Sequence, residues 1–73
     1  MFEETIKMTA SRHEMAEALQ EDCGAILVAE SRSGNTQVWR AESGALVEVV
    51  YLKSGNAEVT GIKEIPENLT VRY

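Results

Sequence analysis

The sequence predicts a single small α+β domain, residues 1–73, in which one helix packs on one face of a mostly antiparallel, twisted sheet. Three observations lead to this prediction. A capping motif introduces one stretch of helical periodicity near the N-terminus. Three Ser-Gly turns follow at intervals of 10 and 11 residues, which is the spacing of an antiparallel meander. The 73 residues leave room for one domain only.

The first strand and the only helix open the chain. Alternation of apolar and polar residues predicts a strand over 2–8. Ser11 and Glu14 fit a capping box, in which the serine hydroxyl accepts a hydrogen bond from the Glu14 N–H and the Glu14 carboxylate reaches back. Apolar residues then recur every four positions, so we expect a helix over 11–23 with one apolar stripe facing the sheet. Gly24 stands where a left-handed residue ends the helix.

The remaining strands are expected to follow as hairpins. The apolar run 25–29 is typical of an interior strand covered on both sides. Further strands are expected over 36–42, 45–53, 57–64 and, after Pro66, over 68–73. The predicted order of elements is β-α-β-β-β-β. Gly61 interrupts one of these strands, and a β-bulge there would turn both Val59 and Ile62 inward.

Charge and the counts of Cys and His argue against several classes of site. A net charge of −5 and a pI near 4.7 disfavour direct nucleic-acid binding, because such domains are usually basic. The single Cys excludes an intramolecular disulfide framework and a Cys-rich zinc site. His13 and Glu17 share a helix face, but two residues are too few for a metal site. The sequence therefore predicts no metal.

Catalytic and targeting motifs are absent from the sequence. It has no G-x-S-x-G motif and no glycine-rich phosphate-binding loop, and a sheet with one helix offers little depth for an active site. We therefore expect a non-enzymatic protein without a cofactor. No signal peptide precedes the first strand, and no apolar run approaches the roughly 20 residues that span a bilayer. These features favour a cytoplasmic protein with no membrane partner.

Negative charge is concentrated at the start of the chain. The first 22 residues hold six acidic and two basic residues, a net charge of −4, whereas the remaining 51 carry a net charge of −1. Glu14, Glu17 and Glu21 fall on the helix side opposite the apolar stripe, and we call these three residues the acidic helix face. One interpretation is a solvated surface that keeps a small protein dispersed. The other is an electrostatic surface for a basic protein partner.

Aromatic residues supply a second set of candidates. Trp39 and Arg40 are consecutive in one expected strand, and Tyr51 lies in the next. Trp39 fits core packing, since the chain has few aromatic side chains. If it were exposed on the sheet face that the helix leaves uncovered, Trp39 beside Arg40 would instead form an anchor for a partner.

Three hypotheses of function follow. The first is a small protein-binding module that blocks a basic nucleic-acid-binding surface by steric cover or acidic mimicry. Small acidic phage and mobile-element inhibitors of host machinery, including anti-CRISPR proteins, form the analogous class. The second is a homodimeric structural or assembly protein that pairs through a sheet edge or an open sheet face. The third is a small regulatory domain that binds a ligand or nucleic acid.

Overall fold

The computed structural model describes residues 5–9 and 11–71. Within these residues the chain forms one helix and six strands. Their bounds are β1 Thr5–Thr9, α1 Arg12–Cys23, β2 Ile26–Glu30, β3 Thr36–Arg40, β4 Leu46–Tyr51, β5 Asn56–Ile62 and β6 Thr70–Val71. The strands form a single sheet in the order β1-β5-β4-β3-β2-β6, and every neighbouring pair is antiparallel. The predicted α+β class, with one helix on an antiparallel sheet, is confirmed. The short β6 corresponds to the strand predicted over 68–73, so each of the six predicted strand ranges has a counterpart, one strand more than the order β-α-β-β-β-β counts.

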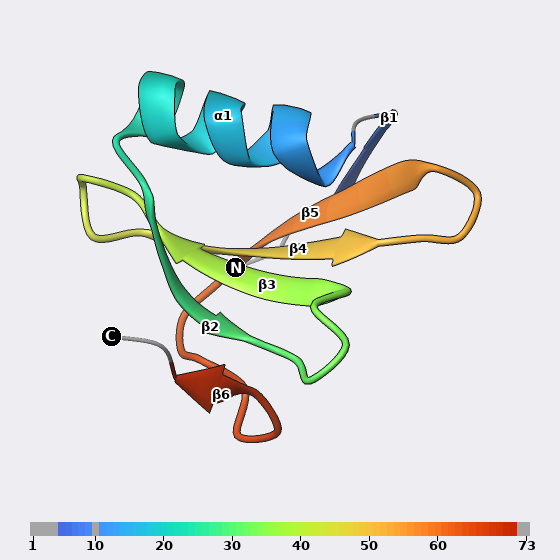
Figure 1. Cartoon of the computed structure of the whole chain (residues 1–73). Helices are drawn as coiled ribbons and strands as arrows, with labels where there is room; N and C mark the ends of the chain where they lie inside the picture. Colours follow the sequence, from blue (N-terminus) through green and yellow to red (C-terminus); the bar gives the residue numbers. More distant parts are fainter. Residues whose placement is uncertain (1–4, 10, 72–73) are drawn as a thin grey trace.

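The helix crosses the sheet because of where its flanking strands lie. Strand β1 is at one edge, whereas β2 is separated from it by β5, β4 and β3. The connection between β1 and β2 must therefore pass over the intervening strands, and Figure 1 shows α1 above them on one face of the sheet. One face of α1 therefore packs against the sheet, and the other face is exposed to solvent.

Both predicted ends of the helix are confirmed. The Ser11 hydroxyl accepts a hydrogen bond from the Glu14 N–H at 3.2 Å, and the Ser11 N–H donates to the Glu14 carboxylate at the same distance. Gly24 ends the helix with a φ of 60°, a conformation that disfavours residues with a side chain. The N–H of Glu42 donates to the Cys23 carbonyl at 3.1 Å, which ties this helix end to the turn between β3 and β4.

The core has two parts, one on each face of the sheet. The part beneath α1 is built from Met15, Leu19, Ala25, Trp39, Val49 and Ala57. The part on the opposite face is built from Val28, Ala29, Val38 and Leu69. Leu69 and the half-buried Ile65 come from the segment after β5, so this segment covers the second face in part. The described residues thus bury apolar side chains on both faces of the sheet with a single helix.

The two turns of the β3-β4-β5 meander share one geometry. Between β3 and β4 the N–H of Gly44 donates to the Ala41 carbonyl at 2.9 Å, and the φ of Gly44 is 95°. Between β4 and β5 the N–H of Gly55 donates to the Leu52 carbonyl at 3.1 Å with a φ of 93°. A type I turn followed by a left-handed glycine is a common way to close a short hairpin. Two of the three predicted Ser-Gly turns are therefore confirmed, and the third, between β2 and β3, also contains a glycine of positive φ, Gly34.

The expected bulge at Gly61 is wrong. Strand β5 pairs with β4 through Gly61 with no shift of register. The irregularity in the sheet lies instead in β2, between Leu27 and Ala29. Val59 packs against the core beneath α1 and Ile62 against the opposite core. Both side chains find apolar neighbours because both faces of the sheet are covered there, so no bulge is required.

Several expected strands are shorter in the structure. The strands predicted over 36–42 and 45–53 end at Arg40 and Tyr51. The last strand, expected over 68–73, consists of Thr70–Val71. Residues 2–4 and 72–73 of the predicted strands lie outside the described residues. In β2 the expectation of cover on both sides holds only in part, since Ile26 is 48% exposed.

Replacement of Leu19 by Ala is expected to destabilise the protein by about 2–5 kcal/mol, because the side chain is buried between α1 and the sheet and its loss leaves a cavity. Urea denaturation followed by Trp39 fluorescence measures this change. The matched control is Gln20→Ala, which alters an exposed neighbour on the same helix and should change stability by less than about 0.5 kcal/mol. Equal effects of the two substitutions would contradict the assignment of the buried helix face.

Candidate functional site

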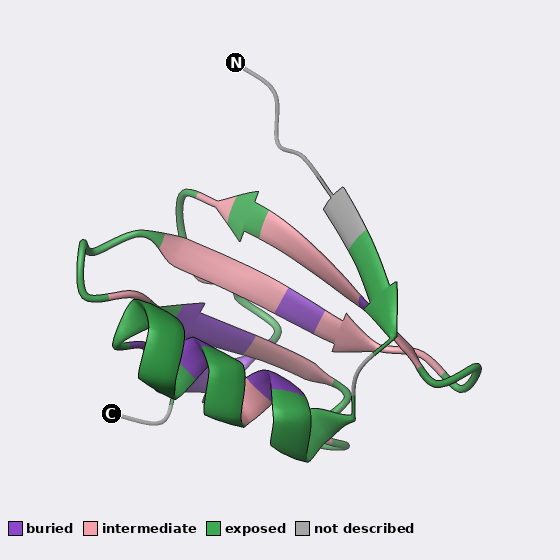
Figure 2. Cartoon of the chain, turned by 90° about the horizontal axis from the view of Figure 1, so that it is seen from above, coloured by how far each residue is buried: buried purple, intermediate pink, exposed green. Residues whose placement is uncertain are grey.

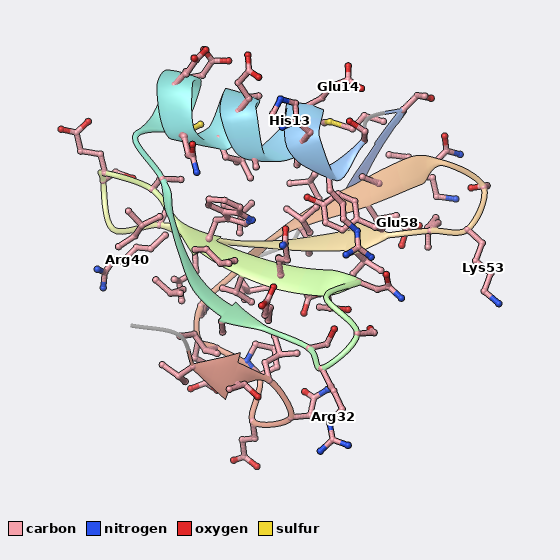
Figure 3. All side chains as sticks on the ribbon, in the orientation of Figure 1. His13, Glu14, Arg32, Arg40, Lys53 and Glu58 are labelled. Atoms are coloured by element: carbon pink, nitrogen blue, oxygen red, sulfur yellow. The ribbon has the colours of Figure 1, made fainter. Side chains whose placement is uncertain are left out.

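The acidic helix face points away from the sheet. Glu14, Glu17 and Glu21 are all exposed, and Asp22 extends the row into the last turn of α1. Figure 2 shows α1 exposed along its outer surface and buried only where it meets the sheet. In Figure 3 Glu14 projects from the helix on the side away from the sheet. The four carboxylates thus form a continuous surface that a partner can reach.

No lysine or arginine among the described residues forms a salt bridge with these four carboxylates. The Glu17 carboxylate lies 3.3 Å from His13 Nε2, and the Glu14 carboxylate accepts the capping hydrogen bond from Ser11. Glu21 and Asp22 lie in the last turn of α1, which contains no basic residue. Negative charge near a helix C-terminus opposes the helix macrodipole. The placement of Glu21 and Asp22 is therefore unfavourable for the helix itself.

Trp39 is buried beneath α1, with only 3% of its surface exposed. Its indole N–H donates to the Gln37 side-chain oxygen at 3.3 Å. Core packing of Trp39, the first of the two interpretations, is therefore confirmed, and the interpretation as an exposed anchor is wrong. Because neighbouring residues of a strand point to opposite faces, Arg40 lies on the other side of the sheet and is exposed. The structure thus separates Trp39 from Arg40.

Tyr51 is half-buried at the margin of the helix–sheet interface. Its hydroxyl donates to the Gln37 side-chain oxygen at 3.0 Å, so one amide oxygen accepts hydrogen bonds from both aromatic residues. The guanidinium carbon of Arg12 lies 5.3 Å from the centre of the Tyr51 ring, a cation–π arrangement. Burial raises the pKa of Tyr51, and the charge of Arg12 opposes that rise. Tyr51 therefore belongs to a surface different from the acidic helix face.

Arg12 is the residue that the sequence analysis missed. Its guanidinium donates a hydrogen bond to the side-chain oxygen of Asn35, in the turn between β2 and β3. Together with Tyr51, this contact joins the start of the helix to two distant parts of the sheet. No local sequence pattern predicts that Arg12, Asn35 and Tyr51 lie together, because the three residues come from separate elements. A signal would have required knowledge of the strand order.

The described part of the chain offers neither a metal site nor a membrane-spanning helix. It holds no group of three or more His, Cys, Asp or Glu side chains placed to bind a metal ion. No helix of this part is long and apolar enough to cross a membrane. The free Cys23 is exposed at the end of α1.

Comparisons with protein-family models, with curated proteins and with solved structures give no match to the chain.

Tyr51→Phe is expected to lower stability at neutral pH by about 1 kcal/mol, because the hydrogen bond to Gln37 is lost. This difference should shrink as the pH rises above 10.0. The tyrosine ionises first in the unfolded state, whose pKa is lower, so wild type loses stability as the pH passes from 10.0 through the raised pKa of folded Tyr51. Urea denaturation across this pH range measures both effects. A difference independent of pH would contradict the raised pKa.

Proposed function

We propose that the chain is a small non-enzymatic protein-binding module that docks on a basic surface of a partner through its acidic helix face. By covering that surface it would compete with nucleic acid for the same lysines and arginines. An inhibitor of host machinery encoded by a phage or mobile element, of the anti-CRISPR kind, is the biological setting that fits this mode of action. Such a protein works in the cytoplasm of the host.

The observation that carries the proposal is the placement of uncompensated carboxylates on α1. Glu21 and Asp22 oppose the helix macrodipole, and no described lysine or arginine offsets them. A residue pattern that breaks a local stability rule is expected at functional surfaces. A surface needed only to keep the protein dispersed could carry the same charges at the N-terminal end of the helix, where they stabilise it.

The spacing of these charges suits competition with nucleic acid. From Glu14 to Asp22 the helix rises about 12 Å and carries four carboxylates, roughly one per 3–4 Å. A single DNA strand carries one phosphate per about 3.4 Å. A groove of basic side chains arranged for a phosphate backbone would therefore meet a similar density of negative charge on α1. Trp39 contributes by supporting the helix from below rather than by touching the partner.

A charge-matched pair of variants tests the proposal. Wild type is titrated with a fluorescent oligoarginine peptide, alone and in the presence of a short DNA duplex that competes for the peptide. We expect Glu17→Gln/Glu21→Gln to weaken binding about five- to tenfold, with the largest loss at low salt. The control Glu64→Gln/Glu67→Gln removes two exposed acids outside the helix and should weaken binding by less than about twofold. Equal weakening by both variants would show that only net charge matters and would overturn the proposal.

A homodimer is the second candidate, and one observation favours it. Ile26 and Val71 are 48% and 51% exposed, and they lie on β2 and on the paired β6. Exposed apolar side chains on neighbouring strands mark surfaces that a second copy can cover.

Sedimentation at increasing protein concentration separates the two candidates. We expect wild type to sediment as a monomer, because an inhibitor that acts through its helix needs no second copy. A concentration-dependent dimer that is abolished by Ile26→Lys would favour the assembly protein over the inhibitor. The substitution should leave stability nearly unchanged, since the side chain is about half exposed.

A further inference from the structure

A pocket of about 370 Å³ opens at one end of the sheet. It lies where the start of α1 meets the turn after β2 and the turn after β4. Its lining includes the side chains of Thr9, Arg12, Asn35, Tyr51, Lys53 and Asn56. This volume falls at the lower end of the range for small-molecule sites. The pocket is separate from the outward row of carboxylates, although Glu14 borders both.

Arg12 makes two contacts within this pocket. Its guanidinium lies over the Tyr51 ring and donates to the Asn35 side-chain oxygen. A Cβ atom at Gly34 would come within 3.0 Å of Arg12 Nη1, so the glycine leaves the space that the guanidinium fills. A free surface arginine would lose considerable rotamer entropy on binding a ligand, whereas here much of that loss has already occurred on folding.

The charge and hydrogen-bonding groups of the pocket favour an anion. Arg12 and Lys53 supply two positive charges, and the carboxylate of Glu14, the one acid in the lining, already accepts from the Ser11 N–H. In Figure 3 Lys53 projects from the right-hand end of the molecule, whereas Arg40 projects from the opposite end. The amide of Asn56 accepts from the Thr9 hydroxyl at 3.1 Å through its oxygen, so its nitrogen is left to donate.

We propose that this pocket binds a small oxyanion, the phosphate or carboxylate group of a molecule of metabolite size. The guanidinium of Arg12 and the ammonium of Lys53 would pair with the negative charge of the anion, and the Asn56 amide would donate a further hydrogen bond. An extended polyanion does not fit, because the protein carries a net charge of −5 and the pocket is small. The helix amides are not needed, since the capping box already occupies the Glu14 N–H. The inference is independent of the partner proposed for the acidic helix face.

Titration of the ¹⁵N-labelled protein, followed by NMR, tests this site. Inorganic phosphate is the first probe and succinate the second, so the two arms distinguish a phosphate from a carboxylate preference. We expect saturable shifts at millimolar concentration in the signals of Arg12, Asn35, Lys53 and Asn56, with few changes along the outer face of α1. Absence of saturable shifts with both probes would overturn the proposal.

Three variants locate the binding groups. Arg12→Gln should weaken binding about tenfold or more, because a charge-assisted contact is lost. Lys53→Gln removes the positive charge of an exposed turn residue, which should leave the fold intact and weaken binding about two- to fivefold. Lys63→Gln makes the same change of charge in the segment after β5, away from the pocket lining, and should leave binding unchanged. If Lys53→Gln and Lys63→Gln weaken binding equally, the anion is held by net charge alone and the site is wrong.

Discussion

Packing of one helix against one face of the sheet is the constraint on which the rest of the molecule depends. Met15 and Leu19 are the buried residues of α1, and they meet Trp39 and Val49 from the sheet below. The helix reaches this position because β1 and β2 lie on opposite sides of the three central strands. Since its inner face is fixed by this packing, α1 has one outward surface on which charge can vary without cost to the core. The carboxylates lie on that surface.

Local features of the fold could be predicted from the sequence. Features that act through near neighbours in the chain leave a pattern that the sequence shows. These features are the capping residues Ser11 and Glu14, the terminal Gly24 and the Ser-Gly turns. The predicted bulge at Gly61 failed because it assumed one covered face, whereas the segment after β5 covers part of the second. That cover depends on the pairing of β6 with β2, which joins segments about forty residues apart and leaves no periodic signal.

The candidate sites also differ in how far they could be predicted from the sequence. The acidic helix face could be placed from helical spacing alone, and the structure leaves its three residues exposed as expected. The side of the sheet on which Trp39 lies could not be decided, because alternation groups residues by face without saying which face the helix covers. The neighbourhood of Arg12, Asn35 and Tyr51 requires the full strand order. The result is a molecule with opposite charge on adjoining surfaces, negative along α1 and positive in the pocket that Arg12 and Lys53 line.

The most direct measurement is the free energy of unfolding of Glu21→Gln/Asp22→Asn, compared with wild type by urea denaturation. If these acids serve a partner rather than the fold, their neutralisation should raise stability by about 0.5–1 kcal/mol, because they oppose the helix macrodipole. Glu14→Gln should have the opposite sign, since the Glu14 carboxylate belongs to the capping box. A loss of stability in the Glu21→Gln/Asp22→Asn variant would show that the two acids support the fold, and would contradict a surface kept for binding.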